Sequence, residues 1–113
     1  TTASYQAFFD RNTPVDYEIA RFIKPKLKEN DTVFVWGNTA QLYQLIGVIP
    51  ISKYIVAYHI TNYKDGIPVT KAALEKEKPK FIVIMPNQPF PFSLTDYFNK
   101  IQINNASIYE RLL

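Results

Sequence analysis

This sequence has few residues of the types that usually serve in catalysis or metal binding, and one of them is a histidine. His59 is the only histidine among 113 residues, and the chain has no cysteine. A catalytic triad or a metal cluster would have to be built around His59 from distant partners, and neither an HExxH spacing nor an acidic pair supplies them. We therefore predict no catalytic residue and no metal site, and we expect His59 to make local hydrogen bonds at the end of a strand.

A strand-to-helix turn made of Trp36, Gly37, Asn38 and Thr39 is the second candidate. Open α/β sheets bind ligands at the carboxyl ends of parallel strands, and amides at the next helix start can hold an anion. One glycine is too few for a dinucleotide fingerprint, and no Walker lysine follows. Two interpretations stay open: a pocket for a small anionic ligand, and a compact turn with Trp36 packed on the sheet edge.

Aromatic residues with hydroxyl groups gather around the second predicted strand. Such rings bind sugars or polar lipid heads, and they equally form the amphipathic edge of a core. The tyrosines concerned are Tyr43, Tyr54, Tyr58 and Tyr63. We add Tyr43, Tyr58 and His59 to the Trp36 turn as candidate ligand contacts. Phe90 and Phe92, spaced by prolines, either fold back onto the core or meet a partner or a membrane interface.

Helical patterns alternate with short apolar strands along the chain. Strands are predicted at 32–36, 53–58, 81–85 and 107–112, the last as an edge strand. Helices are predicted at 13–24, 40–46, 69–78 and 94–100. This alternation predicts the α/β class, a Rossmann-like three-layer sandwich with a mostly parallel sheet of about four strands and helices on both faces. The pattern does not give the strand order.

Length and charge narrow the function classes. The 113 residues fit a single α/β domain spanning 1–113, and the net charge of +3 is too small to predict a nucleic-acid partner. No apolar run is long enough to cross a bilayer, and no signal peptide is visible, so we expect a soluble piece. The chain begins with Thr1, and its only methionine is Met85. From this we expect a domain cut from a larger protein.

Several short motifs occur in an order that resembles a known family. They are the helix start at Thr13 and Pro14, the strand and turn at 33–37, the helix with Gln41, Leu42 and Tyr43, the stretch Ser52, Lys53 and Tyr54, and the strand entry Pro79, Lys80 and Phe81. Together they resemble the soluble C-terminal domain of multi-spanning membrane glycosyltransferases of the dolichyl-phosphate-mannose protein mannosyltransferase type, including bacterial relatives.

The resemblance implies an accessory domain of an enzyme that uses a polyprenyl-phosphate-linked sugar. It would lie on the extracytoplasmic side of the membrane, periplasmic or extracellular, beside the membrane portion of the parent chain, and would position a glycan or protein acceptor. The catalytic acid would belong to the membrane portion, so this fragment would not catalyse alone, and no cofactor is expected. Two alternatives remain: a free-standing α/β module for a small anionic ligand, and, ranked last, an independent enzyme using His59.

Overall fold

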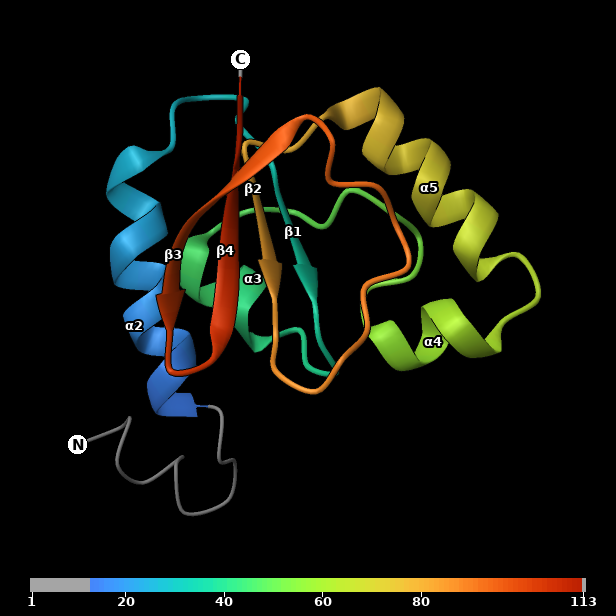
Figure 1. Ribbon diagram of the computed structural model, residues 1–113, viewed down its shortest axis with the longest axis horizontal. Coiled ribbons are helices and arrows are strands. Elements are labelled where there is room, and N and C mark those ends of the chain that lie inside the picture. Colours follow the sequence, from blue (N-terminus) through green and yellow to red (C-terminus); the bar gives the residue numbers. More distant parts are fainter. Residues whose placement is uncertain (1–12, 113) are drawn as a thin grey trace.

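The computed structural model describes residues 13–112 and places helices on both faces of a four-stranded sheet (Figure 1). The helices and strands follow one another as α2 (Thr13–Ile23), the 3-10 helix η1 (Lys24–Lys26), β1 (Val33–Trp36), α3 (Gln41–Ile46), α4 (Ala57–Asn62), α5 (Gly66–Glu77), β2 (Phe81–Ile84), β3 (Tyr97–Ile103) and β4 (Ala106–Arg111). Within these described residues, no helix is both long and apolar enough to cross a membrane.

The sheet is mixed, so the prediction of a mostly parallel, Rossmann-like sheet is wrong. The strand order is β1-β2-β4-β3, and only β1 and β2 run parallel. β4 is antiparallel to both of its neighbours. The reason lies in the turn between β3 and β4, where Asn104 and Asn105 have φ of 48° and 72°. Two successive left-handed residues make a tight hairpin, and a hairpin forces its two strands to be antiparallel.

Two of the predicted elements have a different structure. The strand predicted at 53–58 is an irregular segment followed by α4, whose first residue Ala57 donates its N–H to the Gly37 carbonyl at 2.8 Å. This segment buries Ala57 while Tyr58 stays exposed, so it lacks the two covered faces of a central strand. The helix predicted at 94–100 is instead a turn leading into β3, because the hairpin pairs Tyr97 with Arg111.

The strands at 32–36 and 81–85 are confirmed as β1 and β2, which are buried because helices cover both faces. The predicted strand at 107–112 is confirmed as β4, but it lies inside the sheet and is not an edge strand. Alternation along β1 sends Val33 and Val35 to the face covered by α2 and α3. Phe34 and Trp36 point to the opposite face, which α4, α5 and the segment after β2 cover.

Candidate functional site

A cavity of about 280 Å³ opens where β1 and β2 end, and we call it the strand-end pocket. Its polar lining consists of Asp16, Gly37, Asn38, Thr39, Asn87 and Gln88. Its apolar lining consists of Val35, Leu42, Met85 and Pro86. The pocket therefore combines the start of α2, the turn after β1 and the turn after β2. It occupies the place where sheets with parallel strands usually bind ligands.

The parallel pairing of β1 and β2 builds this pocket. Trp36 is in register with Ile84, so both strands end at the same edge of the sheet. The Met85 N–H still donates to the Trp36 carbonyl at 3.0 Å, which holds the two outgoing segments together. A Cβ on Gly37 would lie 2.7 Å from Cγ of Met85. Glycine is therefore what allows the two turns to approach each other without moving the Met85 side chain.

Charge in the strand-end pocket comes from one carboxylate. Asp16 lies in the first turn of α2, and only 2% of its surface is exposed. No lysine, arginine or histidine lines the pocket among the residues that the structure describes. A carboxylate in a poorly hydrated site attracts positive charge more strongly than it would in water. The amide and hydroxyl groups of Asn38, Thr39 and Asn87 add hydrogen-bonding capacity without changing this sign.

Three of the residues predicted from sequence meet in the pocket. Gly37, Asn38 and Thr39 line it together. The Asn38 side chain also fixes α4, because its Oδ1 accepts a hydrogen bond from the Tyr58 N–H at 2.9 Å. The hydroxyl of Thr39 accepts from the Gln41 N–H at 3.4 Å, at the start of α3. The polar turn thus both lines the cavity and ties two helices to the end of β1.

Trp36 and Tyr43 do not line the strand-end pocket, and both side chains are buried in the core. Trp36 is buried on the face opposite the pocket, where its ring meets the rings of Phe90 and Phe92 at centroid distances of 5.8 Å each. Phe90 and Phe92 therefore fold back onto the core. The hydroxyl of Tyr43 accepts a hydrogen bond from the Val35 N–H at 2.9 Å. Burial raises the pKa of Tyr43 to about 12, although this hydrogen bond lowers it in part.

Tyr58 and His59 project from α4 into solvent, with Tyr58 64% exposed. The ring centroids of Tyr58 and His59 are 6.0 Å apart, and those of His59 and Tyr63 are 5.5 Å apart. The expected strand-end position of His59 is wrong, because His59 sits in a short helix. Its ring contacts there are aromatic, and it does not line the strand-end pocket.

The pocket also contains residues that we did not predict. Asp16, Asn87 and Gln88 line it, and none of the three is among the candidate ligand contacts taken from the sequence. The signal that identifies Asn87 and Gln88 is their position directly after a second buried strand, the same position that the Trp36 turn has after the first. Within residues 13–112, no group of three or more acidic or histidine side chains is placed to hold a metal ion.

Comparison with known families gives one match. Residues 16–109 match the family described as "Putative competence-induced protein Ccs4 C-terminal domain". This match covers most of the chain, and the chain therefore belongs to that family. The identification as a mannosyltransferase-type glycosyltransferase domain is wrong, because the motifs behind it are short strand entries and helix starts that unrelated α/β domains share. No curated protein and no solved structure matches the chain.

Proposed function

We propose that this chain is a binding module that holds a small, positively charged polar molecule in the strand-end pocket. The observation that carries the proposal is the buried Asp16 carboxylate in a cavity whose other lining residues within 13–112 are uncharged. Since a molecule of liquid water occupies about 30 Å³, the cavity has room for a ligand of about nine non-hydrogen atoms. That is the size of an amino alcohol, a diamine or a small amino sugar.

The chemistry of the lining favours an ammonium group over the anion that the Trp36 turn suggested. An anion in this small cavity would lie close to the negatively charged Asp16 carboxylate, which would repel it. An ammonium donates three hydrogen bonds, which the Asp16 carboxylate and the side-chain carbonyls of Asn87 and Gln88 are able to accept. The family description names a competence-induced protein, and we propose that this binding serves such a protein.

The experiment is thermal unfolding of the chain with ethanolamine and putrescine, and separately with phosphate and acetate. A ligand at 100 times its Kd stabilises the folded state by about 2.7 kcal/mol, which raises the Tm of a domain of this size by about 10 °C. We expect such a rise with at least one of the amines and none with the anions. A rise with phosphate alone would contradict the proposal and favour an anion site.

Two substitutions test the role of the carboxylate. Asp16→Asn keeps the shape of the side chain and removes its charge, so the amine should no longer raise the Tm. Because Asp16 also lies in the first turn of α2, the ligand-free variant should itself lose about 0.3–1 kcal/mol. Each variant is therefore compared with its own ligand-free midpoint. Glu18→Gln, an exposed acid on the same helix and outside the pocket, is the control and should keep the full response.

Other expectations stay predictions. They are the position on the extracytoplasmic side, the contact with a membrane portion of a longer parent chain, the nearby membrane surface, and a glycan or protein acceptor as partner. Because the chain belongs to a different family, we do not propose a role in sugar transfer.

A further inference from the structure

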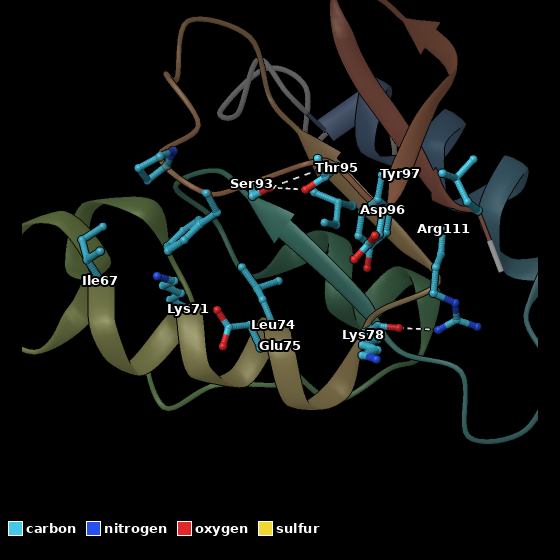
Figure 2. Close-up of a pocket in the computed structure, with 14 residues that line it drawn as sticks. Ile67, Lys71, Leu74, Glu75, Lys78, Ser93, Thr95, Asp96, Tyr97 and Arg111 are labelled. Atoms are coloured by element: carbon cyan, nitrogen blue, oxygen red, sulfur yellow. Dashed lines mark hydrogen bonds between the residues drawn. The ribbon is translucent and has the colours of Figure 1, made fainter.

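A second and larger cavity lies on the other face of the sheet, between α5, the segment 91–97 and the end of β4 (Figure 2). We call it the α5 groove, and its volume is about 900 Å³. Ligand sites in proteins commonly have volumes of about 300–1,000 Å³. Neither the strand-end pocket nor the proposed binding of an amine involves any residue of this groove.

The groove exists because α5 is held away from the sheet. Along its twelve residues only Gly66 and Thr70 are buried. It reaches the core through Ile67 and Leu74, which pack only partly buried against the cluster around Phe34 and Trp36. The apolar side chains that line the groove are Ile67, Leu74, Ile82, Pro91, Phe92 and Leu112. Apolar surface that is half covered gains free energy when a ligand removes it from water.

Two of the three cations that line the groove lie at one of its ends. Figure 2 shows Ile67 at one end, with Lys78 and Arg111 at the other, where Arg111 Nη1 donates a hydrogen bond to the Lys78 carbonyl. Lys71 lies along the helix between them. Within residues 13–112 none of these three cations forms an ion pair with a carboxylate.

Two acids in the lining offset part of this charge, and Figure 2 shows one of them, Asp96, on the same side of the groove as Arg111. Glu75 and Asp96 also line the groove, which leaves a net charge of +1 from three cations and two acids. An apolar floor with cations at one end matches a molecule that has an apolar tail and an acidic head. The groove is therefore complementary to such a molecule in both polarity and charge.

Two backbone N–H groups at the Arg111 end of the groove already have acceptors. The Arg111 N–H donates to the Lys80 carbonyl and the Leu112 N–H to the Asp96 carbonyl, both at 2.9 Å. The groove also crosses β2 and β4, which are the two inner strands, so it borders no open sheet edge at these strands. A peptide strand therefore cannot add to β2 or β4 here, and we expect recognition to come from apolar burial and side-chain charge.

We propose that the α5 groove binds a long-chain fatty acid, with the tail toward Ile67 and the carboxylate at Lys78 and Arg111. The first test is calorimetric titration of the unaltered chain with laurate below its micelle concentration. The titration is repeated with dodecyltrimethylammonium, which has a twelve-carbon tail and the opposite charge. We expect laurate to bind at least tenfold more tightly. Equal affinity for the two amphiphiles, or binding only above the micelle concentration, would overturn the proposal.

Chain length and head charge are tested separately. Affinity should rise by up to about fourfold for each methylene added between octanoate and laurate, because each buried methylene contributes about 0.8 kcal/mol. Lys78→Gln should weaken laurate binding at least threefold. Lys76→Gln, on the same helix but outside the groove, should leave it unchanged. Affinity that is independent of chain length, or equal losses in the two variants, would contradict a fatty acid site.

The chain carries its own reporter for this site. Trp36 is the only tryptophan, and its ring lies 5.8 Å from that of Phe92, which lines the groove. Laurate should therefore change the Trp36 fluorescence with the affinity measured by calorimetry. Asp16→Asn should leave this response intact, so a failure of the amine site and a failure of the groove are distinguishable.

Discussion

The substitution Tyr43→Phe tests how the outer strand of the sheet is held. Within residues 13–112 the one strand beside β1 is β2, and the N–H of Val35 in β1 donates to the buried hydroxyl of Tyr43 at 2.9 Å. Phenylalanine keeps the ring of Tyr43 and leaves this N–H without its acceptor. A buried donor that loses its partner costs about 1–3 kcal/mol. For 113 residues this corresponds to a fall in Tm of about 4–12 °C.

The same substitution has a second effect at alkaline pH. Burial raises the pKa of Tyr43 from 10.0 to about 12 in the folded state. The neutral phenol is thus favoured by folding, so its contribution to stability is complete below pH 10 and is lost as the pH rises from 10 to 12. Two pKa units correspond to about 2.7 kcal/mol. Over that range the unaltered chain should lose about this much more stability than Tyr43→Phe loses.

The assay is urea unfolding at pH 7 and at steps from pH 9 to 11.5. Tyr58→Phe makes the same chemical change at an exposed position and should alter the free energy of unfolding by less than about 0.5 kcal/mol. Burial also raises the pKa of Tyr97 to about 12, so part of the alkaline loss should persist in every variant that keeps Tyr97. If Tyr43→Phe unfolds like the unaltered chain at pH 7, the hydroxyl does not hold β1.

Substitutions at three further positions test the turns and one side-chain pair. Asn105 has a φ of 72°, so Asn105→Ala should lower the free energy of unfolding by about 1 kcal/mol in a urea titration, while Asn105→Gly should not lower it. A Cβ at Gly66 would lie 2.0 Å from the carbonyl oxygen of Ile60, so Gly66→Ala should cost about 3 kcal/mol or more in the same assay. A hydrogen bond from Tyr54 helps to hold the pKa of Asp65 below its ordinary value, so Tyr54→Phe should raise the midpoint of the Asp65 carboxyl in an NMR titration.

The elements predicted correctly are those whose own residues explain their burial. β1 and β2 are runs of β-branched and aromatic residues, and both are covered on each face. β3 was missed because most of its residues are exposed, so it shows little of the apolar alternation that marks a strand. Its structure depends on pairing with β4 across the Asn104 and Asn105 turn. The missed β3 and the strand wrongly predicted at 53–58 together changed the predicted sheet from mixed to mostly parallel.

Only some residues of the strand-end pocket were predictable from the sequence. Gly37, Asn38 and Thr39 follow a strand in the sequence, and the general rule for strand ends locates them. Asp16 reaches the same cavity from α2 because Ile19 and Ile23 pack that helix against the sheet. Such convergence is a product of tertiary packing, and spacing along the chain does not reveal it.

The alternation of β1 and β2 also separates the two proposed sites. Val35 lines the strand-end pocket on the α2 and α3 face, while Ile82 lines the α5 groove on the opposite face. The sheet therefore stands between an acidic polar cavity and a cationic apolar one. Because the sites share no lining residue, the effects of Asp16→Asn and Lys78→Gln on stability should add within about 0.5 kcal/mol in the double variant. A larger deviation would mean that the sheet transmits changes from one site to the other. In that case an amine should change the affinity of the chain for laurate, and laurate should change the affinity for the amine by the same factor.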